Sequence, residues 1–164
     1  MSATGRAWLT REEGYRTRAY RDTEGNWTTG VGHLIGPDEQ DLITRTLSED
    51  EVDALLRSDL ATAEAAVSAT RTKLPLLQDE FDALVHLVFN IGAGAYAGST
   101  LKRRLEEGAS PASLREAWLM WNRPSVLIPR RRREWRVFAT ASYMVATVLT
   151  MTAAALLLLA ASKS

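Results

Sequence analysis

A long amphipathic pattern begins at Ser48, and it constrains the fold of this chain more than any other feature. Ser48 followed by Glu51 fits a capping box, in which each side chain bonds the backbone N–H of the other residue. Apolar residues then recur at helical spacing as far as about Thr70, namely Val52, Leu55, Leu56, Leu60, Ala63 and Val67. The sequence therefore predicts one long amphipathic helix.

Further helical patterns follow in the C-terminal direction. The predicted helices run from Gln78 to Ile91, from Ser99 to Glu107, from Ser110 to Trp121 and from Arg130 to Phe138. Gly92 and Gly108 are placed to end the first two, because glycine accepts the backbone conformation that follows a helix. This part of the chain is expected to be a helical lobe, with its three tryptophans mostly in the core: Trp118, Trp121 and Trp135.

The N-terminal part has a different pattern. Ser2 or Thr4 could cap a short helix to about Glu12, and Gly14 would end it. From Arg16 to Leu34, Tyr, Trp, Thr and Val alternate between glycines, which favours a small hairpin or three-stranded sheet. Residues 37–46 are expected to be loop. The fold class is thus α+β and mainly α, with a small sheet beside a helical lobe.

Composition limits the possible functions. The 164 residues suit one domain, and 20 basic against 20 acidic residues give no reason to expect a nucleic-acid partner. The absence of cysteine excludes disulfides, thiolate nucleophiles and Cys-type zinc sites. His33 and His86 do not have metal-ligand spacing, so we expect no metal or cofactor, and we interpret His86 as a structural residue. We expect a monomer, and the N-terminus lacks the apolar segment of a secretory signal.

The composition changes sharply after Phe138. Residues 139–161 form a stretch of 23 residues without a charge. As a helix this stretch would be about 35 Å long, against a bilayer core of about 30 Å. We interpret residues 1–138 as the folded domain and residues 139–164 as a hydrophobic tail that can cross a membrane once. A buried helix of the domain or a displaced reading frame would also explain the tail, which is only moderately hydrophobic because it contains five Ser or Thr residues.

Three polar residues near the N-terminus suggest a reaction. If the turn in DTEGNWT is centred on Gly25, Asp22 and Thr28 lie opposite each other, with Cβ atoms about 5 Å apart, and could hold a water molecule. Glu13 would meet the negative end of the first helix dipole, and this position and burial both favour its protonated form. A protonated acid and an ionised acid beside a water molecule are the requirements of inverting glycoside hydrolysis. Spacing alone is weak evidence, because these residue types are common.

The stretch from Glu13 to His33 resembles the phage-type lysozymes, the endolysin muramidases of glycoside hydrolase family 24. Their signature is Glu, eight residues, Asp, five residues, Thr, and Glu13, Asp22 and Thr28 match it in register. The resemblance continues through FNIGAGAYAGSTL (residues 89–101) and AWLMWNRPSVLIPRRRREW (residues 117–135). It covers roughly residues 3 to 138 and does not include the tail.

This resemblance implies a lysozyme-like fold and a role for each matching residue. Glu13 would be the general acid, and Asp22 and Thr28 would position the attacking water. The substrate would be the β-1,4 bond between N-acetylmuramic acid and N-acetylglucosamine in peptidoglycan. The presence of Asp22 and Thr28 favours hydrolysis over the lytic transglycosylase reaction of related phage enzymes.

Four further residues match family positions near the sugar cleft. Phe89 and Asn90 would border the cleft and contact substrate, or they are a core phenylalanine and a helix-capping asparagine. Glu24 and His33 match positions near the cleft, where a salt bridge or hydrogen bond that supports the structure is expected more often than catalysis.

The predicted function is therefore that of an endolysin that degrades the cell wall for host lysis. The alternative is a membrane-tethered scaffold that binds wall glycan with little turnover. The arginines at 130–133 and 136 could attract the anionic wall polymer, form a solvated face or flank a membrane segment. Positive charge beside a membrane segment favours the cytoplasmic side, so we expect the enzyme in the host cytoplasm or on the inner membrane before lysis, and at the wall after release.

Overall fold

The computed structural model describes residues 1–22, 24–72 and 75–140. The elements in chain order are α1 (Ala3–Glu13), β1 (Arg16–Arg21), β2 (Trp27–Gly30), β3 (His33–Leu34), the 3-10 helix η1 (Pro37–Ile43), α2 (Glu49–Ser68), α3 (Gln78–Ile91), α4 (Ala93–Ala97), α5 (Thr100–Glu107), α6 (Pro111–Leu119) and the 3-10 turn η2 (Ser125–Leu127). A last helix covers residues 128–140. The predicted class, a mainly helical α+β fold, is confirmed.

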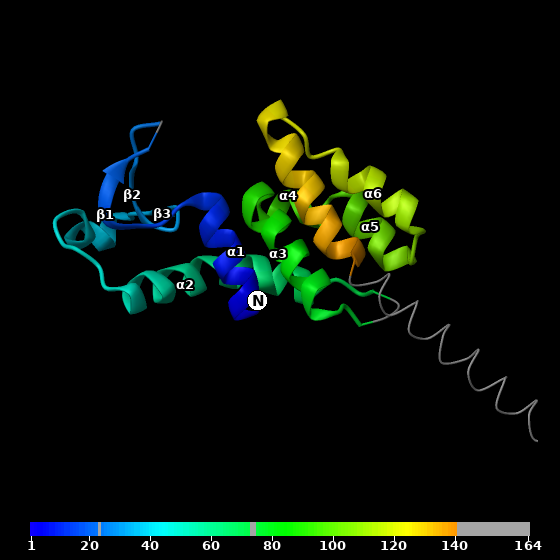
Figure 1. The fold of residues 1–164 in the computed structure, drawn as a ribbon, viewed down its shortest axis with the longest axis horizontal. Coiled ribbons are helices and arrows are strands. Elements are labelled where there is room, and N and C mark those ends of the chain that lie inside the picture. The colour runs from blue at the N-terminus through cyan, green and yellow to red at the C-terminus, as the bar shows by residue number, and fades with distance from the viewer. Residues whose placement is uncertain (23, 73–74, 141–164) are drawn as a thin grey trace, which may run out of the picture.

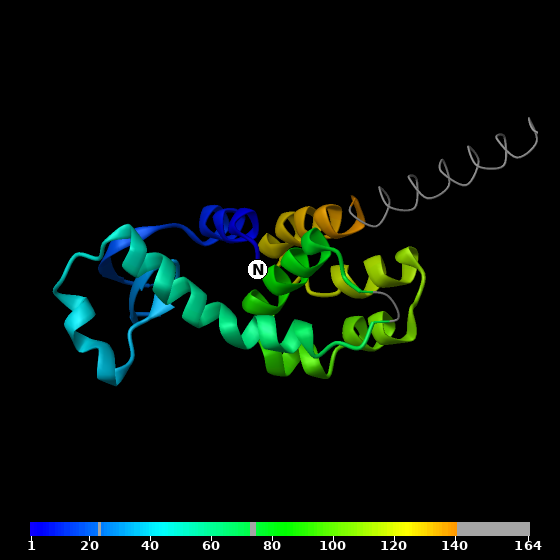
Figure 2. The same ribbon diagram turned by 90° about the horizontal axis from the view of Figure 1, so that it is seen from below.

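The elements form two lobes joined by α2 (Figure 1). The antiparallel sheet, in the order β1-β2-β3, lies with η1 at one end of α2. At the other end, α3 to α6 and the last helix form the helical lobe. The same separation is visible after a quarter turn (Figure 2), where α1 lies between the sheet and the last helix.

The long helix α2 begins at the predicted capping box. Glu51 N donates to Ser48 Oγ at 3.3 Å, and Ser48 N donates to Glu51 Oε2 at 2.8 Å, so both backbone donors are satisfied. The buried residues of α2 form one stripe: Val52, Leu56, Leu60, Ala63 and Val67. This stripe packs against α3 and α4 at one end and against β2 and β3 at the other, so α2 fixes the two lobes relative to each other.

Helix α3 is the centre of the helical lobe. Every residue from Asp82 to Val88 is buried, which is the pattern of a helix surrounded on all sides. His86 is fully buried and its ring stacks on that of Trp8, with centroids 3.6 Å apart. Burial, assisted by the charge of Arg130, lowers the pKa of His86 to about 3, so the ring is neutral. His86 is therefore a core residue, as predicted.

One local prediction was wrong, and one short helix was not predicted. Residues 37–46 are not all loop, because Pro37–Ile43 forms η1. The ring of Pro37 fixes its φ near the helical value. Glu39 Oε2 also accepts a hydrogen bond from Gly36 N at 3.0 Å, which caps the start of the turn, so both local effects favour a helical turn here. The short helix α4 was not predicted, because five residues are too few to show a periodic pattern.

Residues 141–164, most of the uncharged segment, lie outside the described residues. Among the helices of residues 1–22, 24–72 and 75–140, none is long and apolar enough to cross a membrane.

Candidate functional site

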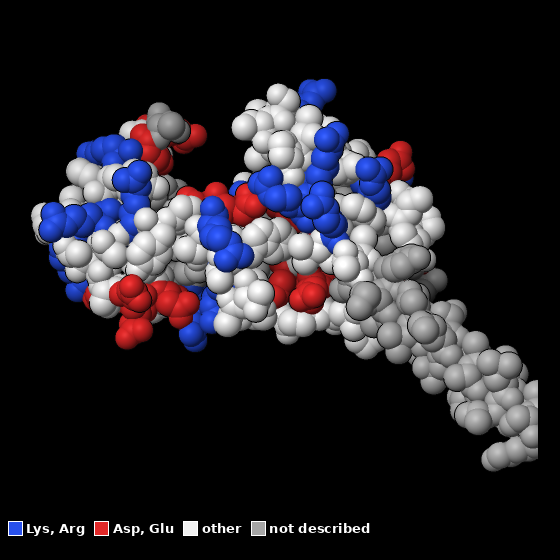
Figure 3. Space-filling view, viewed as in Figure 1, with Lys and Arg blue, Asp and Glu red and all other residues white. Residues whose placement is uncertain are grey.

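Glu13 is the last residue of α1, where the helix meets the sheet. Ser2 caps the start of α1 by accepting from Gly5 N, and Gly14, with φ 90°, ends it. The Glu13 side chain is only 23% exposed. In the space-filling view the molecule is hollowed between the two lobes, and acidic side chains lie on the floor of the hollow (Figure 3). The end of α1 thus places Glu13 at the joint between the lobes.

A cation from the last helix contacts Glu13. Arg130 Nη1 lies 2.6 Å from Glu13 Oε1. This contact is a salt bridge, and within the described residues Glu13 Oε1 has no aligned hydrogen-bond donor. The expectation of a protonated Glu13 considered only the helix end and burial, and it left out this cation.

The hairpin between β1 and β2 differs from the predicted one by one residue. Thr28 pairs with Tyr20, not with Asp22, so the expected direct opposition of Asp22 and Thr28 is wrong. Asp22 instead faces Asn26, because Asp22 N donates to Asn26 O at 3.0 Å. The turn is therefore centred at Glu24. Gly25, with φ 87°, occupies the last loop position, where a three-residue hairpin loop requires a left-handed residue.

Asp22 and Thr28 nevertheless lie on one face of the hairpin. Asp22 directly follows β1, and its hydrogen bond to Asn26 O continues the register of Tyr20 with Thr28. Residues two apart in an extended backbone point the same way, so Asp22 shares the face of Tyr20 and of its partner Thr28. Asp22 and Thr28 are then diagonal cross-strand neighbours, which lie about 7–8 Å apart. That spacing leaves room for one water molecule to bond to both side chains.

The environment of Asp22 keeps its carboxyl ionised. Its Oδ1 accepts from Asn26 N at 2.8 Å and from Glu24 N at 2.9 Å. The Asn26 N–H is the main cause of a lowered pKa for Asp22, and the Asn26 side chain and the other backbone donors of the turn add to it. Thr28 is 3% exposed, and its hydroxyl is 3.4 Å from Asn26 O, a weak hydrogen bond. An ionised acid and a hydroxyl without a strong partner thus share this face.

Phe89 and Asn90 lie in the last turn of α3, in different environments. Asn90 is exposed, and its Oδ1 accepts a hydrogen bond from Arg131 Nη2. The helix cap is Gly92, so Asn90 is not the capping asparagine of the alternative interpretation. Phe89 is half-buried and packs against the core. Asn90 thus has a polar side chain held in place at the surface, while Phe89 is mainly a packing residue.

His33 and Glu24 have separate positions. His33 Nδ1 lies 3.0 Å from Asp59 Oδ1 in α2, and Nε2 lies 3.1 Å from Glu39 Oε2 in η1. The imidazole therefore joins β3 to two neighbouring elements, which is the supporting role that we expected more often than catalysis. Glu24 is exposed in the hairpin turn, where its backbone N–H donates to Asp22. Their roles in substrate binding remain predictions.

The His33 contacts make stability depend on pH. Burial lowers the pKa of His33, but the hydrogen bonds and charges of Asp59 and Glu39 outweigh it, so the net pKa is raised above 6.5. A raised folded-state pKa contributes stability that is complete below 6.5 and is lost as pH rises through the folded value. We expect His33→Asn to lower the free energy of unfolding more at pH below 6.5 than in alkaline solution. Urea unfolding at several pH values measures this, and an equal loss at all pH values would contradict it.

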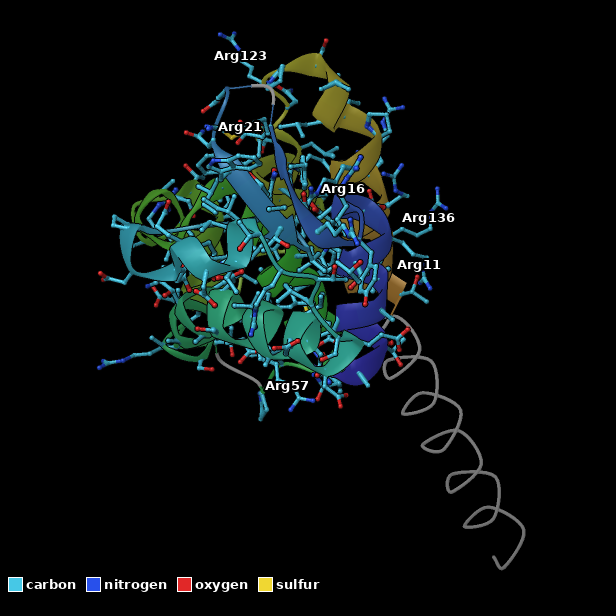
Figure 4. The ribbon with its side chains drawn as sticks, turned by 90° about the vertical axis from the view of Figure 1, so that its left-hand side faces the viewer. Arg11, Arg16, Arg21, Arg57, Arg123 and Arg136 are labelled. Carbon is cyan, nitrogen blue, oxygen red and sulfur yellow. The ribbon has the colours of Figure 1, made fainter. Side chains whose placement is uncertain are left out.

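The arginine run of the last helix is divided between interior and surface. Arg130 is 8% exposed and Arg131 is fully buried, whereas Arg132, Arg133 and Arg136 are exposed. Figure 4 shows Arg136 pointing outward on the same side as Arg11 of α1. The three interpretations of the run treated it as one cluster, whereas only Arg132, Arg133 and Arg136 are exposed; which of them applies to these three stays a prediction. Arg130 and Glu134 have the i,i+4 spacing of a helical ion pair, but the exposed pair of Arg103 and Glu107 has the same spacing, so no local signal distinguishes the buried arginines.

Comparison with known proteins places this arrangement in a family. The family described as Phage lysozyme matches residues 10–134, which include the paired Glu13 and Arg130 as well as Asp22 and Thr28. The chain belongs to the phage lysozyme family. The endolysin of Salmonella phage P22 is 40% identical over 143 residues, covering 84% of this chain and 97% of that protein. The endolysin of Acyrthosiphon pisum secondary endosymbiont phage 1 is 35% identical and covers 86% and 99%.

Solved structures agree with this assignment. A crystal structure of a mutant P22 lysozyme superposes with a TM-score of 0.74 at 39% identity, covering 85% of this chain and 97% of that chain. The muramidase domain of SpmX from Asticaccaulis excentricus gives 0.69 at 32% identity, covering 84% and 95%. The predicted family, the lysozyme-like fold and the enzyme class of a lysozyme-type glycosidase are therefore confirmed.

Proposed function

We propose that this phage lysozyme is an endolysin that hydrolyses the β-1,4 bond between N-acetylmuramic acid and N-acetylglucosamine in bacterial peptidoglycan. The observation that carries the proposal is the position of two unlike carboxyl groups. Glu13 lies at the joint of the lobes against Arg130, and Asp22 lies on the hairpin face with Thr28. The membership of the family supports the same substrate class.

The two carboxyl groups would have different roles in the reaction. Glu13, bearing a proton, donates it to the leaving glycosidic oxygen. Asp22, ionised and held by the hairpin amides, directs a water molecule to the anomeric carbon and takes its proton as the new C–O bond forms and the glycosidic C–O bond breaks. The Thr28 hydroxyl is the second contact of that water. Separate acid and water-directing groups are the requirement of an inverting hydrolysis.

Other residues would bind the glycan rather than react with it. Asn90 presents an exposed amide whose oxygen is fixed by Arg131, and a fixed amide suits hydrogen bonds to sugar hydroxyl and acetamido groups. Phe89 supports it from the same helix end. Glu24 lies in the exposed turn beside Asp22, where its side chain is free to meet substrate, whereas His33 acts through the sheet.

Release of new reducing ends from purified cell walls tests the proposal. The full-length protein should produce them in proportion to time and enzyme concentration. The alternative, a scaffold that binds wall glycan with little turnover, predicts sedimentation of the protein with walls but no new reducing ends. The similarity to endolysins over almost their whole length favours the enzyme.

We also propose that residues 139–164 anchor the enzyme to the inner membrane before lysis. The support is the sequence itself, since 23 consecutive residues carry no charge and the exposed arginines of the last helix precede them. The full-length chain is expected in the membrane fraction of expressing cells, and a version that ends at Phe138 in the soluble fraction. Recovery of both in the soluble fraction would overturn the anchor and would leave the hydrolysis unaffected.

A further inference from the structure

Glu134 of the last helix is a fully buried carboxylate with three donors around it. Arg130 Nε lies 3.0 Å from Glu134 Oε1, and Arg131 Nη1 bonds to Oε2. Trp118 Nε1 donates to the same Oε2 at 3.3 Å. A buried charge is tolerated only when it is paired and hydrogen-bonded, and Glu134 meets that condition from three sides.

The two arginines extend from Glu134 in two directions. Arg130 reaches Glu13 at the end of α1, with Nη1 2.6 Å from Oε1. Arg131 donates from Nε to Trp121 O at 3.0 Å and from Nη2 to Asn90 Oδ1. One buried carboxylate therefore holds both the cation beside Glu13 and the guanidinium that fixes Asn90.

The cation of Arg130 is shared by two carboxyl groups. One positive charge between Glu13 and Glu134 stabilises each anion less than it would stabilise one alone, and the negative charge of Glu134 repels an ionised Glu13. If Glu134 lost its charge, the positive charge of Arg130 would act on Glu13 alone and would favour the ionised form of Glu13. A general acid must hold a proton before it reacts, so this sharing bears directly on the chemistry.

Among the described residues, the other charged or titratable groups that act on this cluster are Glu12, Arg133, His86 and Arg131. Glu12, next to Glu13 in α1, is bonded by Arg133 at 2.7 Å. His86 of α3, close enough to Arg130 to respond to its charge, is neutral because its pKa is about 3. Arg131 lies on the far side of Glu134 from Glu13 in the chain of contacts and also carries a charge that acts on the cluster.

We propose that Glu134 is a positioning residue of the lysozyme reaction, which holds Arg130 against Glu13 and, by sharing that cation, allows Glu13 to carry the proton for the leaving oxygen. This inference rests on the proposed function, in which Glu13 is the general acid. It adds a residue on the opposite side of the arginine, remote from the signature of Glu13, Asp22 and Thr28.

The test is the pH profile of kcat/KM for full-length Glu134→Gln on purified cell walls. The amide keeps the shape and removes the charge. Because activity is lost on the alkaline side when the general acid deprotonates, the alkaline limb should move to lower pH by about one unit. KM should change little, and activity should recover on acidification. A limb at the wild-type pH with lower kcat throughout is the result of a merely structural role and would overturn the inference.

Two further variants keep the test decisive. Glu134→Asp retains the charge but shortens its reach to Arg130, so the limb should move in the same direction by a smaller amount. If Glu134→Gln does not fold, the Glu134→Asp variant provides the test, and an alkaline limb at the same pH as in the wild type overturns the inference. Glu107→Gln is the matched control, since its exposed pair with Arg103, at 2.9 Å, is on α5, and its limb should stay in place.

The outcomes distinguish this inference from the proposed function. A wild-type protein that releases no reducing ends at any pH contradicts the function itself. An active wild type with an unmoved limb in both Glu134 variants contradicts only the role of Glu134.

Discussion

Replacing Glu13 with Gln is expected to lower the rate of wall hydrolysis by about a hundredfold to ten-thousandfold, with little change in stability. The substitution keeps the size of the side chain at the end of α1 and removes the only proton that the proposed mechanism transfers to the leaving oxygen. Arg130 keeps its salt bridge with Glu134, whose Oε1 lies 3.0 Å from Nε, so the arginine remains paired when the charge of Glu13 is removed. Release of reducing ends, measured beside urea unfolding of the same preparation, gives both quantities.

The neighbouring Glu12 supplies a matched control for that experiment. It is in the same helix turn and also pairs with an arginine, with Arg133 Nη2 2.7 Å from Oε2. Glu12→Gln should retain most of the activity, because the reaction does not use this carboxyl group. Similar losses in both variants would mean that Glu13 acts through the local charge and not as a proton donor.

Replacing Arg131 with Met is expected to lower the free energy of unfolding by about 3–5 kcal/mol. Arg131 is fully buried, and its removal takes one of the two cations from a fully buried carboxylate. Burial already raises the pKa of Glu134, and Arg131 is the foremost of the charges that oppose this rise. The variant also leaves Asn90 Oδ1 and Trp121 O without the donors that they have in the wild type.

Urea unfolding of Arg131→Met and Arg132→Met measures this difference. Arg132 is the adjacent, exposed arginine of the same run, and its replacement should change stability by less than about 0.5 kcal/mol. Equal effects in the two variants would show that the burial of Arg131 does not contribute to stability as described.

The sequence predicted most helices, because the signals of a helix are local. The capping box at Ser48 and Glu51, the buried stripe of α2 and the terminating Gly92 all act within a few residues of each other. The hairpin register was harder to predict. A glycine marks a turn but not its own position in it, and Gly25 occupies the end of the loop instead of its centre.

The site was predicted in part for the same reason. The motif could be recognised in the sequence because one short segment contains all three of its residues, Glu13, Asp22 and Thr28. The partner of Glu13 comes from the other end of the domain, and only packing of the last helix against α1 brings Arg130 to it. Burial of Arg130, Arg131 and Glu134 depends on that packing too, and a run of arginines is more commonly solvated than buried.

The central claim is that water attacks the glycosidic bond, and the origin of the oxygen at the newly formed glycan end tests it most directly. Cell walls digested in water labelled with a heavy oxygen isotope can be analysed by mass spectrometry of the released glycans. A water directed by Asp22 and Thr28 while Glu13 protonates the leaving oxygen places the label at each new reducing end of N-acetylmuramic acid. Cleaved glycans that end in an unlabelled anhydro sugar would contradict the account, because the attacking oxygen would then come from the substrate itself.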